Sequence, residues 1–138
     1  MIVSTRRSTT VYTKPVLYEE ALAPLFESLD WIEKTLSVQR YLTGSDITEA
    51  DWRLFTTLIR FDAVYVGHFK CNLHRIADYP SISGYLLDLY QQPGVAETVS
   101  MIHIKRHYYG SHTSINPSGV VPVGPDLDYE TPHGRDAL

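Results

Sequence analysis

Histidines at helical spacing are the first residues whose type could support chemistry. His103 and His107 are four positions apart, so a helix would place both imidazoles on one face, where they could ligate a metal ion. No third ligand follows from the spacing, and His68 and His74, six positions apart, make a poorer pair. We therefore expect no metal site and interpret His103 and His107 as solvated or capping residues. The sequence also has no glycine-rich phosphate loop, no cysteine pair and no HExxH motif.

Cys71 and Asp51 could act as a nucleophile and a general acid. Cys71 has His68 and His74 nearby in sequence, but activation of a thiol by histidine requires proximity in space. A small packed thiol is the favoured interpretation. Asp51 follows Thr48 by three residues, which is the spacing of a capping box, and this structural role accounts for it without chemistry.

The chain also contains ten tyrosines. Three of them lie at core-facing helical spacing and are interpreted as packing residues: Tyr18, Tyr85 and Tyr90. Three others lie at or near predicted helix ends, where a hydroxyl can emerge into a cleft: Tyr65, Tyr108 and Tyr109. Residue type and spacing alone favour packing over catalysis for these three as well.

The first predicted helix covers residues 17 to 37, where apolar residues recur every three or four positions. Pro24 lies inside this pattern and lacks a backbone N–H, so it should kink or restart the helix. The second helix begins at Thr48, where Asp51 completes the capping box, and it runs towards Phe69. Apolar residues cover more than one stripe of this second helix, which predicts that it is buried at the centre.

Shorter helices are predicted in the second half of the chain. One begins at Pro80 and stops at Pro93, and two more cover residues 95 to 99 and 101 to 109. Repeated prolines and glycines beyond Gly110 exclude a long regular element. Three valines could pair as a short strand, although an extended tail packed on the helices is favoured: Val120, Val121 and Val123. The predicted fold is an all-α bundle with an irregular C-terminal tail.

Composition excludes several classes of protein. The length of 138 residues suits one domain, and a single cysteine cannot form an intrachain disulfide. No apolar run approaches the roughly 20 residues of a membrane span. A net charge of −4 does not suit a nucleic-acid partner. We therefore expect no membrane and no nucleic-acid partner.

The distribution of charge and breakers divides the chain into three parts. Residues 1 to 17 are expected to be a poorly ordered leader, residues 18 to 112 a helical domain, and residues 113 to 138 an extended tail packed on the bundle. The first 18 residues contain Arg6, Arg7 and Lys14 but no acidic residue. A frayed leader on a cytoplasmic protein is the favoured interpretation, and an organellar targeting peptide is the alternative.

Several segments in order resemble a known family. RYLTG at residues 40 to 44 and ITEAD at residues 47 to 51 are similar to the capping-box region in the C-terminal helical domain of glutathione transferases. RFDAVYVGHFKC at residues 60 to 71 more narrowly resembles the glutathionyl-hydroquinone reductases, which are the xi class of that superfamily and omega-like. The match continues through YQQPGVAETV at 90 to 99, HY at 107 to 108, INP at 115 to 117 and PHGRD at 132 to 136.

This resemblance implies a reaction as well as a glutathione transferase C-terminal-like fold. Family members use glutathione as co-substrate to reduce a glutathionyl-hydroquinone or quinone conjugate. A cysteine attacks the thioether sulfur, and a second glutathione resolves the mixed disulfide. Two family tyrosines that approach this cysteine correspond to Tyr65 and Tyr108, auxiliary residues whose phenols would stabilise the thiolate. The resemblance also implies a homodimer and a protein without a metal.

Two features depart from the family pattern. The family's nucleophilic cysteine and glutathione site belong to a thioredoxin-like domain that precedes the helices, and Cys71 does not match that cysteine. A proton-transferring tyrosine also precedes the first helix in the family; Tyr12 is the nearest candidate here, whereas Arg7 occupies the family spacing. We therefore expect the substrate-side helical domain of a reductase without its thioredoxin-like domain. The alternative is a catalytically silent binding or dimerisation module, or a truncated gene product.

Overall fold

The computed structural model describes residues 15 to 138, and its regular structure is helical. The longer helices are α2 (Pro15–Val38), α3 (Glu49–Arg60), α5 (Pro80–Tyr90) and α6 (Met101–Ser111). The shorter ones are the π-helix η1 (Phe61–Tyr65), α4 (Val66–His68) and the 3₁₀ helices η2 (Ile76–Asp78) and η3 (Ala96–Thr98). Within residues 15 to 138, strand-like pairing is limited to one isolated bridge between Tyr41 and Gly44. The all-α prediction is confirmed.

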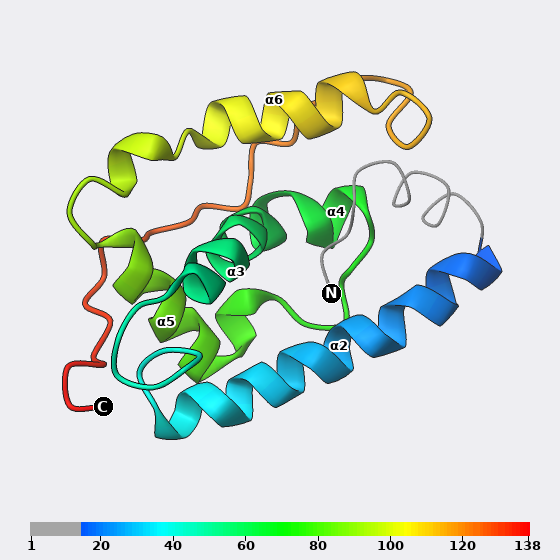
Figure 1. The fold of residues 1–138 in the computed structure, drawn as a ribbon. Coiled ribbons are helices and arrows are strands. Elements are labelled where there is room, and N and C mark those ends of the chain that lie inside the picture. The colour runs from blue at the N-terminus through cyan, green and yellow to red at the C-terminus, as the bar shows by residue number, and fades with distance from the viewer. Residues whose placement is uncertain (1–14) are drawn as a thin grey trace.

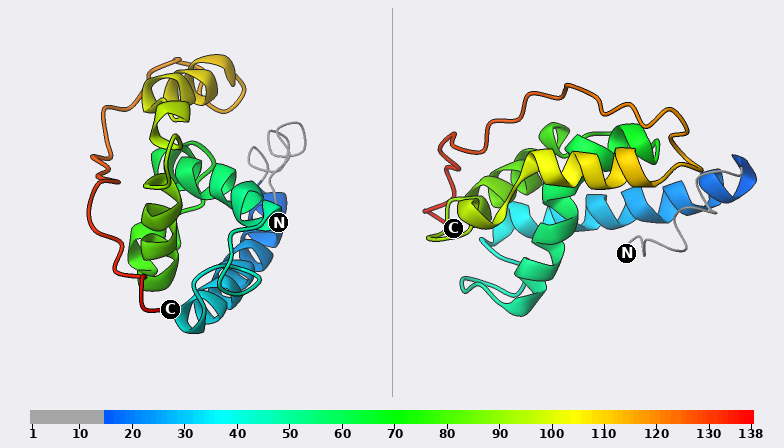
Figure 2. Two further views of the ribbon diagram at one scale, coloured as in Figure 1. Left: turned by 60° about the vertical axis from the view of Figure 1, so that its left-hand side comes forward. Right: turned by 90° about the horizontal axis from the view of Figure 1, so that it is seen from above.

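Helix α3 and the π-helix η1 form the centre of the molecule (Figures 1 and 2). On one side α3 packs against α5, and α5 packs against α2; on the other side η1 contacts α6. The central run is accordingly apolar over much of its surface, with buried side chains that include Leu54, Phe55, Leu58, Ile59, Phe61 and Val64. Among the helices of the described chain, none combines the length and hydrophobicity that a membrane span requires.

Helix α2 is continuous through Pro24, so of the two effects predicted for this residue, a kink or a restart, the restart does not occur. Leu22, Leu25 and Phe26 on either side of the proline are all buried, and packing of this face holds the helix together across the missing hydrogen bond. Pro15 and Val16, which the sequence assigned to the leader, are part of α2, and the rest of the predicted leader lies outside the described residues.

The predicted capping box at the start of α3 is confirmed. The backbone N–H of Thr48 donates to Asp51 Oδ2 at 2.8 Å, and the Thr48 hydroxyl donates to the same oxygen at 3.3 Å. Asp51 is fully buried, and its Oδ1 accepts from the Leu42 N–H at 3.0 Å and from the Tyr85 hydroxyl at 2.8 Å. The Asp51 carboxylate therefore joins the preceding loop, α3 and α5, which agrees with a structural role and not with that of a general acid.

The central helix does not run as one regular α-helix towards Phe69, as the sequence predicts. After Arg60 it widens into the π-helix η1 and then into the single turn of α4. A π-helix accommodates an additional residue in its turn and changes the direction in which the following side chains point. This change of register affects Tyr65 and His68, which lie at and just beyond the π-helix.

The C-terminal tail is irregular, as predicted, and the three valines form no strand. Its last part is tied to the bundle through Arg135, which is buried. The Arg135 Nη2 donates to the carbonyl oxygens of Leu36, Gln39 and Arg40, each at 2.9 Å. These carbonyls lie at and just past the end of α2, where the helix leaves acceptors without intrahelical donors. Arg135 thus caps α2 from almost one hundred residues away.

Candidate functional site

Tyr65 and Tyr108, the two tyrosines selected from the sequence, lie together in the structure. Tyr65 is at the end of η1 and Tyr108 is in the last part of α6, with their ring centroids 5.9 Å apart and the planes nearly perpendicular. Tyr65 is buried, whereas Tyr108 is half-buried. Tyr108 therefore presents the more accessible of the two phenols. Tyr12, the candidate for proton transfer, lies outside the described residues, as does Arg7.

The local contacts of Tyr109 explain how α6 is held against the turn that follows η1. A Cβ atom built on Gly67 would lie 2.7 Å from the Tyr109 hydroxyl oxygen, so glycine at this position permits the close approach. The Asn116 side chain donates to the Tyr109 carbonyl oxygen at 2.7 Å. The Cys71 N–H also donates to the Tyr65 carbonyl oxygen at 3.0 Å. These contacts fix the segment on each side of the tyrosine pair.

The electrostatic environment keeps the Tyr65 phenol protonated. Burial raises the pKa of Tyr65 well above its ordinary value, and the neighbouring Tyr108 phenol raises it further. A phenol that stays neutral at physiological pH can donate a hydrogen bond to an anion. The pair is consequently a donor site, suited to stabilising a thiolate or a phenolate placed beside it.

Two histidines that the sequence did not single out as a pair lie behind Tyr108. His68 Nε2 and His112 Nδ1 are 3.2 Å apart, and the ring centroids of His112 and Tyr108 are 5.4 Å apart. Burial lowers the pKa of His68 to about 4, and the nearby His112 and Lys70 contribute to this shift. Burial also lowers the pKa of His112. Both imidazoles are therefore neutral near pH 7, so one can donate the hydrogen bond that the other accepts.

The His68 side chain also carries an unusual polar atom. Its Nδ1 is buried and has no hydrogen-bond partner among the described residues. The spacing of four residues between Tyr108 and His112 could have indicated that the two contact each other at the end of α6. No local signal could have indicated His68, which lies 44 residues earlier in the chain.

The other sequence candidates do not form a site. Cys71 is 1% exposed, as a packed thiol should be, and its Sγ lies 3.8 Å from the Phe69 carbonyl oxygen. His103 and His107 are exposed on α6. Within residues 15 to 138, no group of three or more histidine, cysteine or acidic side chains could hold a metal ion.

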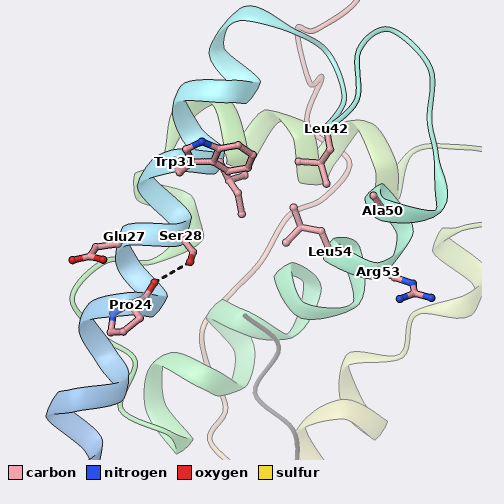
Figure 3. A pocket seen from close by; sticks show the side chains of 9 residues that line it. Pro24, Glu27, Ser28, Trp31, Leu42, Ala50, Arg53 and Leu54 are labelled. Carbon is pink, nitrogen blue, oxygen red and sulfur yellow. Dashed lines mark hydrogen bonds between the residues drawn. The ribbon is translucent and has the colours of Figure 1, made fainter.

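Two surface grooves lie elsewhere on the bundle. One, of about 910 Å³, lies between α2 and α3; Figure 3 shows that Trp31, Leu42 and Leu54 point toward one another across it. The other, of about 720 Å³, lies between α3 and the segment leading into α6. Neither groove is lined by Tyr65 or Tyr108. The chemistry of the tyrosine pair and the larger concave surfaces are thus separate features of this bundle.

Comparison with known proteins relates this geometry to a family. The family model described as "Glutathione S-transferase, C-terminal domain" matches residues 15–87. Glutathionyl-hydroquinone reductase YqjG of Escherichia coli K12 is 56% identical over 124 residues, which are 90% of this chain and 38% of the relative. Glutathionyl-hydroquinone reductase PcpF of Sphingobium chlorophenolicum is 58% identical over 108 residues, which are 78% of this chain and 34% of the relative.

Solved structures of proteins from the same group have the same fold as this chain. The glutathione-bound structure of E. coli YqjG has a TM-score of 0.89 at 52% identity and covers 94% of this chain and 43% of that chain. The Xi class glutathione transferase from Natrialba magadii has a TM-score of 0.91 at 47% identity and covers 96% of this chain and 42% of that chain. The chain spans between about a third and two fifths of the length of the curated relatives above. It belongs to the glutathione S-transferase C-terminal domain family and is homologous to the glutathionyl-hydroquinone reductases and Xi-class glutathione transferases.

Proposed function

We propose that this chain provides the substrate-side helical part of a glutathione-dependent glutathionyl-hydroquinone reductase. Two of the relatives carry that name, and one solved relative binds glutathione. The observation that carries the proposal is the Tyr65–Tyr108 pair, in which a buried phenol of raised pKa packs edge to face against a more accessible one. In this proposal glutathione is a co-substrate and the glutathionyl-hydroquinone is the substrate.

The proposed reaction uses a cysteine thiolate in a thioredoxin-like domain of the family's type. The thiolate attacks the sulfur of the glutathionyl-hydroquinone, forms a mixed disulfide with glutathione and breaks the carbon–sulfur bond. The ring carbon takes the electron pair of that bond and a proton, which yields the free hydroquinone. A glutathione thiolate then displaces the cysteine and leaves glutathione disulfide.

The tyrosine pair has a defined task in this scheme. The Tyr108 hydroxyl donates a hydrogen bond to the cysteine sulfur and thereby favours the thiolate over the thiol. Tyr65 remains protonated because it is buried, and its ring positions Tyr108 through their edge-to-face contact. The rings of His68 and His112 pack against the Tyr108 ring and fix its position. None of these residues acts as the nucleophile.

A chimera tests the proposal. The chain replaces the segment of E. coli YqjG with which it aligns, and the rate of glutathionyl-hydroquinone reduction is measured with glutathione present. We expect reduction by the chimera and a loss of about tenfold or more in kcat on Tyr108→Phe, because a hydrogen bond to a charged sulfur is removed. The matched control is Tyr90→Phe, since Tyr90 stacks on Tyr129 at 5.1 Å and takes no part in the pair. A folded chimera without reductase activity would refute the proposal.

A binding or dimerisation module is the second candidate function. It is favoured by the groove between α2 and α3, beside which Trp31 is 65% exposed. The homodimer expected from the family and the cytoplasmic location favoured by the sequence remain part of the proposal. Sedimentation of the purified chain tests the dimer, and Trp31→Glu should shift the equilibrium towards monomer if this groove is the contact surface. An unchanged distribution would remove the groove from that role.

A further inference from the structure

The groove between α3 and the start of α6 has an aromatic and aliphatic wall. Its volume of about 720 Å³ is within the size range of small-molecule sites. The rings of Trp52 and Phe55 meet nearly edge to face, with centroids 5.9 Å apart. The wall is completed by Ile59, Pro93, Val95, Val99 and Ile104. Such a surface is suited to one planar, apolar ring.

A permanent positive charge lies in the same groove. The Arg60 Nη1 donates to the carbonyl oxygen of Thr56 at 2.7 Å, which folds the side chain back along α3. This is the one hydrogen bond of the Arg60 guanidinium within the described chain, and a guanidinium has five N–H donors. Most of the donors therefore remain for a ligand.

Two further features add hydrogen-bond donors and a partial positive charge to the groove. His103 lines it one turn into α6, and Ser100, which caps that helix, lines it as well. The N-terminus of α6 adds a partial positive charge. No carboxylate occurs among the lining residues of the described chain. The groove consequently combines an apolar wall with uncompensated positive charge.

The groove between α2 and α3 provides the contrast. It is of similar size and contains Trp31, but its lining includes the carboxylate of Glu27. Its arginine, Arg53, is paired with Glu49 at 2.7 Å. Both grooves are apolar, and only the one at α6 offers an unpaired cation among the described residues.

We propose that the α3–α6 groove binds a small aromatic carboxylate. The ring lies against Trp52, Phe55 and Val99, and the carboxylate accepts hydrogen bonds from Arg60. His103 adds a second donor. The site is distinct from the Tyr65–Tyr108 pair, and the proposal does not depend on the reductase function.

The two tryptophans of the chain allow a direct test, because each lines one groove. In the Trp31→Phe chain, all tryptophan fluorescence comes from Trp52. We expect 4-nitrobenzoate to quench this signal saturably, since the nitroaromatic ring would contact the indole. In the Trp52→Phe chain, the remaining Trp31 should show only weak, unsaturable quenching. Equal saturable quenching of both chains would overturn the assignment to the α3–α6 groove.

The role of the Arg60 charge in binding is tested with an uncharged ligand and with arginine variants. Uncharged 4-nitrobenzamide should bind the Trp31→Phe chain about tenfold more weakly than 4-nitrobenzoate, because a charge-assisted hydrogen bond is lost. In that background, Arg60→Gln should weaken the binding of 4-nitrobenzoate by a similar factor. The matched variant Arg53→Gln should leave the affinity for 4-nitrobenzoate unchanged. Circular dichroism verifies the fold of each variant. Equal affinities for the two ligands, or equal effects of the two arginine substitutions, would refute the proposal, and the ligand comparison decides it even if Arg60→Gln fails to fold.

Discussion

The two ends of the central helical run bury polar groups in opposite ways. At the start of α3, the Asp51 carboxylate accepts four hydrogen bonds from the loop, the N-cap residue Thr48 and α5. At the far end, beyond η1, His68 Nδ1 has no partner among the described residues, and the Tyr65 phenol and two imidazoles have shifted pKa values. Saturated buried networks specify a fold, whereas titratable groups with perturbed pKa values cluster where chemistry occurs.

A second buried polar network lies beside Asp51's end of the bundle, and within the described residues its Arg135 Nε is the atom left without a partner. Asp88 is fully buried and accepts from Arg40 Nε at 2.9 Å and from Arg40 Nη2 at 3.1 Å. Burial alone would raise the pKa of Asp88, but the hydrogen bonds from Arg40 and the charge of His133 lower it below the ordinary value. Together with Arg135, this network ties α2, α5 and the tail. The contrast predicts that substitutions at this end cost stability and that substitutions at the tyrosine end cost chemistry.

The largest effect is expected for Asp51→Ala. It would leave the buried Tyr85 hydroxyl and the N–H groups of Leu42 and Thr48 without their acceptor, so the free energy of unfolding should fall by about 4 kcal/mol. Urea denaturation followed by circular dichroism measures this loss. Glu49→Ala removes only an exposed ion pair in the same helical turn and should cost less than about 0.5 kcal/mol. Similar losses for the two variants would contradict the structural role of Asp51.

The next effect concerns pH and the His68–His112 pair. The pKa of His68 in the folded chain is about 4, whereas an unfolded histidine has a pKa of about 6.5. Between these values the unfolded state binds more protons, so stability is complete above pH of about 6.5 and falls as the pH drops towards 4. We expect a loss of up to about 3 kcal/mol over this range.

The variant His68→Phe should flatten that pH dependence while keeping an aromatic ring beside Tyr108. The matched control, His103→Gln, changes an exposed residue and should leave the pH dependence as it is. Urea denaturation at pH 7, 6, 5 and 4 provides the comparison. An equally steep loss of stability in the His68→Phe chain would exclude this histidine as its source.

The smallest expected losses of stability come from removing single tyrosine hydroxyls, and they should differ between Tyr85 and Tyr108. Tyr85→Phe removes a donor to the buried Asp51 carboxylate and should destabilise the chain by about 2 kcal/mol. Tyr108→Phe removes a half-buried hydroxyl and should cost less than about 1 kcal/mol. Thermal unfolding of the two variants shows the difference. If Tyr108→Phe destabilised the chain more than Tyr85→Phe, the assignment of the structural network to the Asp51 end of the molecule would be wrong.

Sequence reasoning succeeded where the determinants are local. The capping box at Thr48 and Asp51 depends on three residues of spacing, and Pro80 begins α5 for a reason contained within one helical turn. The Tyr65–Tyr108 pair came from the family resemblance, because packing of η1 on α6 joins residues 43 positions apart. Its role in catalysis remains a proposal.

The features that sequence reasoning missed depend on long-range packing. Arg135 caps α2 from 95 to 99 positions away, and His68 meets His112 across 44 positions. The π-helix η1 arises after the regular pattern of α3 and places Tyr65 and His68 where an unbroken α-helix would not. The restart predicted as one effect of Pro24 does not occur, because the buried face of α2, which the local rule ignores, holds the helix together.

The central claim is that Tyr65 and Tyr108 stabilise a cysteine thiolate. The most direct measurement is thiolate absorbance near 240 nm as a function of pH in the chimera with E. coli YqjG, with and without Tyr108→Phe. The claim predicts that this substitution raises the pKa of the nucleophilic cysteine by about one unit, since a hydrogen bond to the charged form is lost. Superimposable titration curves for the two chimeras would contradict it.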